Sequence, residues 1–277
     1  MTTTRPTIAD KRRTFDALHA SGCFLIPNPW DVGSARYLQS LGFKALATTS
    51  SGLAWSQGRP DNGLPRDRVL AHLEELVNAT DIPINADFEN GFGADAAGVG
   101  ESVRLAVATG VAGLSIEDST GRAQSPLFEL SEAVDRIRAA RAAIDACGGD
   151  ALLVARAECF IVGRPDIAET VARLQAYANA GADCLYAPGI RTVADISAIV
   201  AAVAPKPVNL LVSAPGNLPL QKIAELGVRR VSVGGALARA AWGRFMQAAR
   251  SLAEHGSFEG FANIPAHDDL DALFPAV

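Results

Sequence analysis

The stretch ATGVAGLSIED, residues 108–118, contains one complete copy of the pattern that decides the fold. A helical segment ends at Gly110, an apolar run covers residues 113–117, and the acids Glu117 and Asp118 close that run. A glycine just past the last helical turn ends a helix, because it adopts a left-handed backbone that other residues avoid. The stretch therefore predicts a helix end, a tight turn and a buried strand that finishes on carboxylates.

The same glycine signal recurs in SLGFKAL, NAGADCL and ELGVRRV, and an apolar run followed by a helical pattern appears eight times. The predicted strands are residues 23–27, 45–49, 82–87, 113–117, 152–156, 184–187, 208–212 and 230–233. The predicted helices are residues 33–41, 66–78, 96–109, 131–147, 167–180, 193–203, 220–226 and 237–255. The strands read as continuous apolar runs, as expected for a parallel sheet covered on both faces. Eight such units without a linker predict an α/β fold, a single (β/α)8 TIM-type barrel over residues 1–277, in which residues 256–277 are a C-terminal helical appendage.

Bulk composition narrows the classes of partner. The 277 residues carry a formal net charge of −5, and no cluster of Lys and Arg suggests a surface that follows phosphates, which argues against nucleic acid. No apolar run approaches the roughly 20 residues of a membrane span, and the N-terminus lacks the apolar core of a signal peptide. The four cysteines form no CxxC pair and are interpreted as buried thiols. We expect a cytoplasmic protein with neither a nucleic-acid nor a membrane partner.

Acidic residues follow neighbouring predicted strands. Asp87 and Glu89 come at the end of the third strand, and Glu117 ends the fourth. Because chemistry in such barrels collects at the carboxyl ends of the strands, we expect these acids to lie close together and to repel one another. Mg²⁺ prefers oxygen ligands and keeps several waters, so it is the expected neutralising ion, with Mn²⁺ as an alternative. For any one acid taken alone, a solvated loop residue is the competing interpretation.

Polar groups at other strand ends suit a carboxylate ligand. Arg156 ends the strand LLVAR, where it can bind a substrate carboxylate through two hydrogen bonds or pair with the neighbouring acids, and the two roles are compatible. TTSSG, residues 48–52, is interpreted as a turn that offers hydroxyls and backbone N–H groups, or as an ordinary loop. Asn209 and Ser213 belong to the seventh unit. SVGGALARA, residues 232–240, fits either a phosphate site or close packing of strand on helix.

Two kinds of chemistry are disfavoured by what the strand ends lack. The four lysines lie before strands or on helices, which argues against a Schiff base. The four histidines lie on predicted helices or in the tail, which argues against a histidine-bound metal or a histidine-based triad.

Four motifs in order at these strand ends resemble the isocitrate lyase/phosphoenolpyruvate mutase superfamily, and within it the methylisocitrate lyase and oxaloacetate decarboxylase-like branch. They are Ser51-Gly52 with GRPD at 58–61, DFENGFG at 87–93, IED at 116–118, and AR-x-E at 155–158. The resemblance covers nearly the whole barrel. It implies that Asp87 ligates Mg²⁺, while Asp61, Glu89 and Glu117 act through coordinated waters.

The resemblance also implies a substrate, a small 2-oxo mono- or dicarboxylate. Ser51 and Gly52 would hold its carboxylate and Arg156 would reach its oxygens, while Mg²⁺ would stabilise the enolate formed when a bond at C3 breaks. The expected metal-binding residues are Asp87, Glu89 and Glu117, the expected catalytic residues are Arg156, Glu117 and Asp61, and the expected substrate-binding residues are Ser50, Ser51, Gly52, Asp87, Arg156, Asn209 and Ser213.

The segment after IED departs from the family pattern. Lyases of the superfamily carry a cysteine-containing loop there, and phosphonate-cleaving members carry a Lys-Thr-Asn loop, whereas residues 119–131 contain no Cys, Lys, His or Asn. Decarboxylation needs no such proton-removing group, so lyase-like or decarboxylase-like C–C cleavage is the leading expectation. A binding protein that keeps the metal site without turnover and a phosphonate or ester hydrolase are the alternatives. Cys159 is interpreted as a packing residue.

Members of this superfamily are commonly homo-oligomers that exchange the eighth helix. The long predicted helix over residues 237–255 and the apolar tail fit a dimer or tetramer of this kind.

Overall fold

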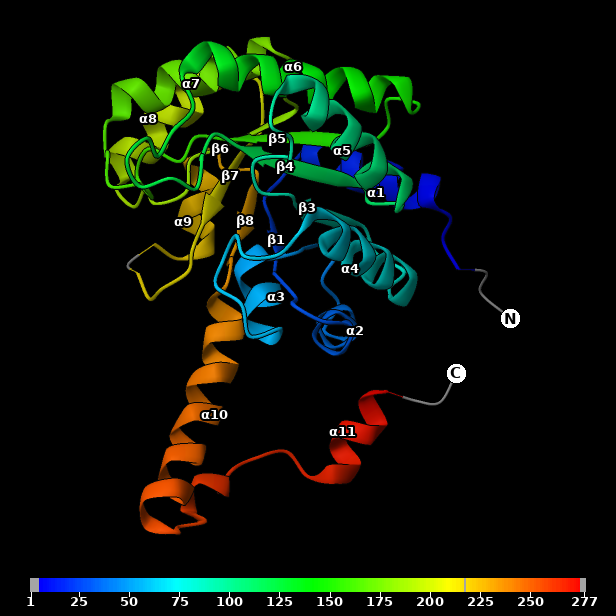
Figure 1. Ribbon diagram of the computed structural model, residues 1–277, viewed down its shortest axis with the longest axis vertical. Helices are drawn as coiled ribbons and strands as arrows, with labels where there is room; N and C mark the ends of the chain where they lie inside the picture. The colour runs from blue at the N-terminus through cyan, green and yellow to red at the C-terminus, as the bar shows by residue number, and fades with distance from the viewer. Residues whose placement is uncertain (1–4, 217, 275–277) are drawn as a thin grey trace.

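The computed structural model describes residues 5–216 and 218–274, and its central feature is one sheet of eight parallel strands. The strand order is β1-β8-β7-β6-β5-β4-β3-β2, and a hydrogen bond of 3.1 Å from the Ala47 nitrogen to the Pro27 oxygen links the two outer strands. The strands are β1 (Phe24–Ile26), β2 (Leu46–Ala47), β3 (Ile84–Asp87), β4 (Gly113–Glu117), β5 (Leu152–Arg156), β6 (Cys184–Tyr186), β7 (Val208–Leu211) and β8 (Arg230–Ser232). The predicted (β/α)8 barrel is confirmed (Figure 1).

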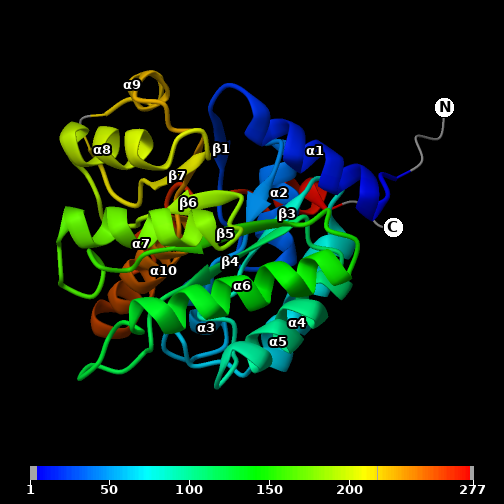
Figure 2. The same ribbon diagram turned by 90° about the horizontal axis from the view of Figure 1, so that it is seen from above.

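Helices connect the strands and surround them, as the view from above shows for α4 to α8 (Figure 2). They are α1 (Ile8–Ala20), α2 (Val32–Ser40), α3 (Ser50–Ser56), α4 (Arg66–Ala79), α5 (Ala96–Ala108), α6 (Leu130–Ala146), α7 (Ile167–Asn179), α8 (Val193–Val203), α9 (Leu220–Glu225), α10 (Ala236–His255), the 3-10 helix η1 (Glu259–Phe261) and α11 (His267–Leu273). All eight predicted helices form. The sequence pattern did not predict α1 or α3.

The turn between α5 and β4 shows why the opening stretch needs its glycine. Gly110 has φ +90°, a left-handed backbone that strains other residues. A methyl group at this position would also come within 2.9 Å of the Ile8 side chain. The predicted helix stop is confirmed, and it turns the chain directly into β4.

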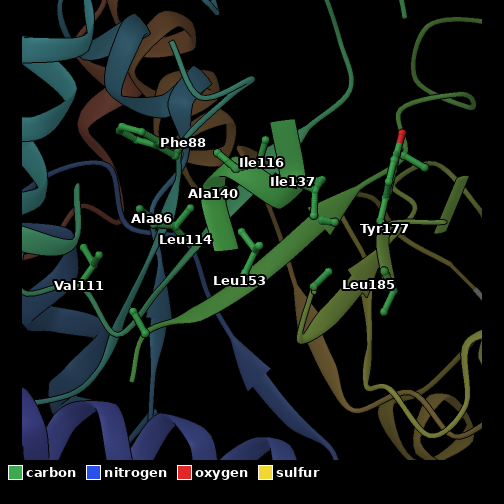
Figure 3. Packing of buried hydrophobic residues seen from close by; sticks show 14 of the residues in the cluster. Ala86, Phe88, Val111, Leu114, Ile116, Ile137, Ala140, Leu153, Tyr177 and Leu185 are labelled. Carbon is green, nitrogen blue, oxygen red and sulfur yellow. The ribbon is translucent and has the colours of Figure 1, made fainter. Parts of the chain in front are cut away.

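The main core lies between the outer face of the sheet and the helices. Ala86 of β3 and Leu114 and Ile116 of β4 are buried there and lie near Ile137 and Ala140 of α6 (Figure 3). Four alternate residues of these two strands are polar and line the barrel cavity, namely Asn85, Asp87, Ser115 and Glu117. In β3 and β4 an apolar outer face therefore alternates with a largely polar inner one, rather than both faces being apolar as the sequence pattern suggested. In β5 and β6, Val154 and Cys184 form a separate apolar cluster.

Helix α1 closes the barrel at the amino ends of the strands. Phe15 is fully buried in a cluster with Ile26, Ala45 and Ala47. The Lys11 ammonium donates to two backbone carbonyls at the end of α4, so α1 also satisfies acceptors left free where that helix stops. With this end sealed, access to the barrel interior lies at the carboxyl ends of the strands.

The C-terminal segment leaves the barrel. Helix α10 has 20 residues of which only Ala238 is buried, and it projects away from the strands (Figure 1). The chain then returns through η1 and α11, where Phe274 approaches Gly33 of α2. The last three residues of the predicted appendage, 275–277, lie outside the described part. Among the described helices, none has both the length and the apolar character needed to cross a membrane.

Candidate functional site

A cavity of about 260 Å³ opens at the carboxyl ends of the strands. Six of the residues predicted for the site line it, namely Ser50, Ser51, Asp61, Asp87, Glu117 and Arg156. The cavity also has lining residues that the sequence pattern did not assign to the site, among them Asn28, Ser119, Glu158, Tyr186, Arg230 and Ser232. The strand ends thus bring most of the predicted site together.

Arg156 lies at the centre of the acidic cluster. Its Nη1 is 2.8 Å from Asp87 Oδ1 and 3.1 Å from Glu117 Oε2, and its Nη2 is 2.9 Å from Glu158 Oε1. Burial disfavours the charge of the guanidinium, but the nearby carboxylates, Glu117 foremost, outweigh burial and raise the pKa of Arg156 above its ordinary value. The Tyr186 ring lies 5.0 Å from the guanidinium carbon. Of the two roles predicted for Arg156, the pairing with neighbouring acids is present in this structure, and its contact with a substrate stays a prediction.

Asp87 is oriented by the end of β2 and the start of α3. Its backbone nitrogen donates to Thr48 Oγ1 at 2.8 Å, and its Oδ2 accepts from the Ser50 nitrogen at 2.9 Å. TTSSG is therefore not a turn, because Thr49 caps α3 and its Oγ1 accepts from the Gly52 nitrogen at 3.3 Å. The Ser50 N–H predicted to be available for a substrate carboxylate is bonded to Asp87 instead.

The cluster contains more acidic groups than its arginine can neutralise, and the pKa values of several of them are raised. Burial first, and then the charge of Asp87, raises the pKa of Asp61. Burial and the charges of Asp87 and Asp61 raise the pKa of Glu89 to about 8, and burial raises the pKa of Glu117 well above its ordinary value. Five carboxylates share one guanidinium, namely those of Asp61, Asp87, Glu89, Glu117 and Glu158.

A divalent cation fits this donor set in its chemistry. Among the described residues, no three His, Cys, Asp or Glu side chains already converge as a coordination shell. The reason is that Arg156 occupies the space between Asp87, Glu117 and Glu158. The donors are nevertheless all carboxyl oxygens that outnumber the arginine, which suits a hard cation that binds few carboxylates and keeps its waters. The ligand set Asp87, Glu89 and Glu117 stays a prediction.

Two further predicted residues stand just behind the cavity wall. Glu89 is only 8% exposed, and its backbone oxygen accepts from the Glu117 nitrogen at 2.9 Å. Its φ of +48° belongs to the left-handed region, so the turn after β3 holds this residue in an unusual conformation. Gly52 is buried in α3 and has no room for a side chain, because a methyl group there would lie 2.7 Å from Thr49 and 2.9 Å from Trp30.

The residues predicted from the seventh unit do not line the cavity. Asn209 is fully buried, donating to Ser232 Oγ at 3.0 Å and accepting from Arg230 Nε at 2.8 Å. Ser213 lies two residues past β7 and is half-buried. A substrate contact for either residue stays a prediction.

The glycines after β8 favour packing over a phosphate site. Asn28 Oδ1 accepts from the nitrogens of Val233 and Gly234 at 2.9 and 2.8 Å, so these N–H groups already have a partner. A methyl group at Gly235 would lie 2.8 Å from Ser51 Oγ. Gly235 therefore lets the start of α10 approach α3 closely.

A second buried network holds the cluster from behind. Asp118 accepts from the Glu158 nitrogen at 2.8 Å, from the Tyr177 hydroxyl at 2.6 Å and from Arg173 at 3.1 Å. Cys159, which follows Glu158 in the chain, is fully buried, and burial raises the pKa of its thiol. Asp118 thus fixes the backbone that presents Glu158, and a buried, protonated Cys159 agrees with a packing role.

Comparisons with known proteins agree on one family. The family model described as phosphoenolpyruvate phosphomutase matches residues 15–253. The chain is 33% identical over 173 residues to 2-methylisocitrate lyase of Escherichia coli K12, a match that spans 59% of this chain and 57% of that protein. It is 31% identical over 233 residues to oxaloacetate decarboxylase of Pseudomonas savastanoi pv. phaseolicola, spanning 79% and 77% of the two chains. A crystal structure of a protein from Burkholderia cenocepacia J2315 superimposes with a TM-score of 0.94 at 47% identity, covering 97% of this chain and 98% of that one.

Proposed function

Because the chain belongs to the phosphoenolpyruvate phosphomutase family, a family of lyases and mutases that act on 2-oxo acids, we propose that it is a Mg²⁺-dependent enzyme that cleaves a C–C bond in a small 2-oxo carboxylate. One observation carries the proposal, namely five carboxylates around a single arginine at the open end of the barrel. Decarboxylation is the favoured reaction, and oxaloacetate decarboxylases stand among the relatives.

The acidic cluster supports the metal part of the proposal. Superfamily members depend on a metal ion. Asp87 would hold Mg²⁺ with help from Glu89 and Glu117, and Mn²⁺ is the alternative. When bound, the ion would neutralise part of the cluster and stabilise negative charge that develops on the 2-oxo oxygen of the substrate.

The chain's own residues account for binding and proton supply. Arg156 and the hydroxyls of Ser50 and Ser51 line the cavity and would bind a substrate carboxylate. Loss of CO₂ leaves an enolate that must take up one proton at C3. Asp61 and Glu117 line the same cavity, and burial raises the pKa of both carboxyl groups, so these two side chains would supply that proton.

The segment after β4 supports decarboxylation over other cleavages. Ser119 is the residue from this segment that lines the cavity, and residues 119–131 contain no Cys, Lys, His or Asn of the kind that the lyase and phosphonate-cleaving loops carry. Release of CO₂ needs no such group.

Turnover with a panel of substrates tests the proposal. Purified protein with Mg²⁺ is incubated with C4–C6 2-oxo and 2-hydroxy acids, while CO₂ and 2-oxo products are measured. Release from at least one 2-oxo acid, lost on chelation and restored by Mg²⁺, is expected. Tight Mg²⁺-dependent binding in calorimetry without turnover would instead make the protein a binding protein, and phosphate release from phosphonopyruvate would make it a hydrolase.

We also propose a homo-oligomer, a dimer or tetramer, in which α10 packs on a second copy. Trp242, Phe245 and Met246 of α10 are 38%, 61% and 44% exposed, and Trp55 of α3 joins two of them in a groove of about 560 Å³. An apolar surface of this kind marks an interaction site. Light scattering should show a multiple of the 28.9 kDa chain mass that falls in Phe245→Arg. Tyr37→Arg on α2, at a similarly exposed aromatic residue, is the matched control and should leave the mass unchanged.

A further inference from the structure

A second arginine lies below the acidic cluster, at the floor of the cavity. Arg230 opens β8, is only 2% exposed and lines the cavity. Its Nε donates to Asn209 Oδ1 at 2.8 Å, and its Nη1 lies 3.3 Å from Asn85 Oδ1 and 3.4 Å from His19 Nε2. Burial, and then the charge of Arg230, lowers the pKa of His19 to about 3, so this histidine is neutral near pH 7. Every hydrogen-bond partner of Arg230 among the described residues is therefore uncharged.

The guanidinium thus carries a buried charge that the described residues do not neutralise. No carboxylate among them lies within 4.0 Å of its nitrogens, whereas Arg156 contacts three. Burial lowers the pKa of Arg230, and the groups that oppose this shift are the Cys184 thiol and the Tyr186 phenol, not an acid. A guanidinium does not give up its proton in a protein, so it stays charged, and a buried charge without a counter-charge is strongly unfavourable.

One part of this guanidinium is available to a ligand. Nη2 makes no hydrogen bond with the described residues. It is also absent from the side-chain nitrogens of these residues that are completely buried without a partner, so Nη2 keeps some accessible surface. Because Arg230 lines the cavity, the space that Nη2 borders is the cavity itself. The surrounding wall adds polar groups from Asn85, Ser115 and Ser232.

We propose that Arg230 forms an anion subsite at the floor of the cavity, which takes one carboxylate-sized anion below the acidic cluster. The occupant is either the second carboxylate of a dicarboxylate substrate or a small inorganic anion. Asn85 lies two residues before Asp87 on β3, and a rise of about 3.3 Å per residue places it about 7 Å deeper, comparable with the length of a short dicarboxylate. The part that concerns the substrate rests on the proposed function, whereas anion binding does not.

The cavity then has two ends of opposite character. The upper end is rich in carboxylates and suits a cation, and the lower end presents an unneutralised guanidinium and suits an anion. A dicarboxylate whose 2-oxo end lies at the metal and whose far end lies at Arg230 satisfies both. A monocarboxylate satisfies only the first, so Arg230 would select between the two classes.

Anion binding is tested on the metal-free full chain. Thermal unfolding is followed while sodium chloride replaces sodium gluconate at constant ionic strength, and crystals are soaked in bromide. Wild type should gain melting temperature with chloride and show bromide beside Arg230. Arg230→Met should lose both responses, Arg230→Lys should keep part of them, and the neighbouring Arg229→Met, which removes the same charge outside the cavity, should behave as wild type.

Asn209→Asp provides a variant that keeps the arginine. It places a carboxylate at the acceptor that lies 2.8 Å from Arg230 Nε, so it should raise the melting temperature without chloride and remove the chloride response. It therefore decides the question even if Arg230→Met does not fold. An equal chloride response in wild type, Arg230→Met and Asn209→Asp would overturn the subsite.

Kinetics identify the occupant. Losing a charge-assisted hydrogen bond of about 1.5–3 kcal/mol corresponds to roughly a 10- to 140-fold change in binding. Arg230→Met should raise KM for 2-oxo dicarboxylates by this factor and leave KM for 2-oxo monocarboxylates unchanged if the substrate occupies the subsite. An anion response without this KM difference assigns it to an inorganic anion. Absence of turnover with every acid would refute the proposed function while the anion response still decides the subsite.

Discussion

Replacing Asp118 by alanine is expected to destabilise the protein far more than breaking an ion pair of the same length at the surface. The carboxylate of Asp118 lies 3.1 Å from Arg173, and that of Asp135 lies 3.1 Å from Arg138. The side chains of the first pair are 1% and 8% exposed, whereas those of the second are 60% and 64% exposed. Replacing Asp118 or Asp135 by alanine therefore breaks ion pairs that have the same length and differ in burial.

The magnitude follows from what Asp118 leaves behind. Its loss removes the acceptor of the Tyr177 hydroxyl and of the Glu158 nitrogen, and it leaves Arg173 buried with Glu169, 2.9 Å away, as its remaining ion-pair partner. Breaking a buried pair from one side costs about 3–5 kcal/mol. Because Glu169 still neutralises Arg173, we expect about 3 kcal/mol. An exposed pair contributes about 0.2–1 kcal/mol.

Thermal unfolding can separate these values. For 277 residues, an unfolding entropy of about 2.1 cal/mol/K per residue gives about 0.6 kcal/mol/K, so 3 kcal/mol lowers the melting temperature by about 5 °C. Asp135→Ala should lower it by less than about 2 °C. Asp118→Asn keeps an oxygen acceptor without the charge and should fall between them. Equal shifts for Asp118→Ala and Asp135→Ala would refute the reasoning.

Three further predictions concern the cluster, pH and backbone packing. Asp87→Ala should abolish Mg²⁺-dependent binding of 2-oxo acids in calorimetry, whereas Cys159→Ala should preserve it; the reverse result would place the site elsewhere. Burial, and then the charge of Arg68, lowers the pKa of His72 to about 4 in the folded protein. The neutral His72 side chain therefore contributes to stability above pH 6.5, and this contribution is lost as the pH falls toward 4. His72→Leu should therefore flatten urea-measured stability over that window, and an unchanged slope would contradict this. Gly93→Ala should lower the free energy of unfolding by roughly 1–3 kcal/mol, because its methyl group would lie 2.2 Å from a backbone nitrogen of α5. Gly100→Ala should raise it by about 0.5–1 kcal/mol, because Gly100 lies within α5 and the nearest atom to its added methyl group is 3.5 Å away. Equal urea midpoints for the two variants would count against both predictions.

The barrel could be predicted from the sequence because its signals are local. Each strand is a short apolar run, and a glycine such as Gly110 stops the preceding helix within a few residues. The proximity of the acids at the ends of β3 and β4 could be predicted from the same pattern, because the carboxyl ends of parallel strands meet at one rim of the barrel. Asp87, Glu117 and Arg156 were found in this way, and they do meet in the structure.

The helix that closes the barrel could not be predicted in the same way. Helix α1 buries Lys11, Arg12 and His19 beside Phe15, so its inner face does not read as apolar. The Lys11 and Arg12 side chains donate to backbone carbonyls at the ends of α4 and α5, a role that depends on distant parts of the chain. Helix α3 is only seven residues long, and TTSSG starts it instead of forming a turn.

The polar part of the barrel interior has a sequence signal of its own. β3 reads Ile-Asn-Ala-Asp, and β8 reads Arg-Val-Ser, so polar residues recur at every second position, as on one face of a strand. Reading these strands as uniformly apolar hid Asn85, Arg230 and Ser232. Strand alternation alone would have placed them in the interior, although not in contact with one another.

The two interior arginines explain why the cavity can hold charge at both ends. Arg156 and Arg230 are chemically identical and both line the cavity, so their different surroundings decide what each does. Arg156 is paired with carboxylates that neutralise its charge, whereas Arg230 is bonded to amides and a neutral imidazole and keeps an unpaired positive charge. Amides orient a guanidinium without neutralising it, because they accept hydrogen bonds but carry no net charge. A ligand with a cation-binding group at one end and an anion at the other therefore fits the cavity in only one direction.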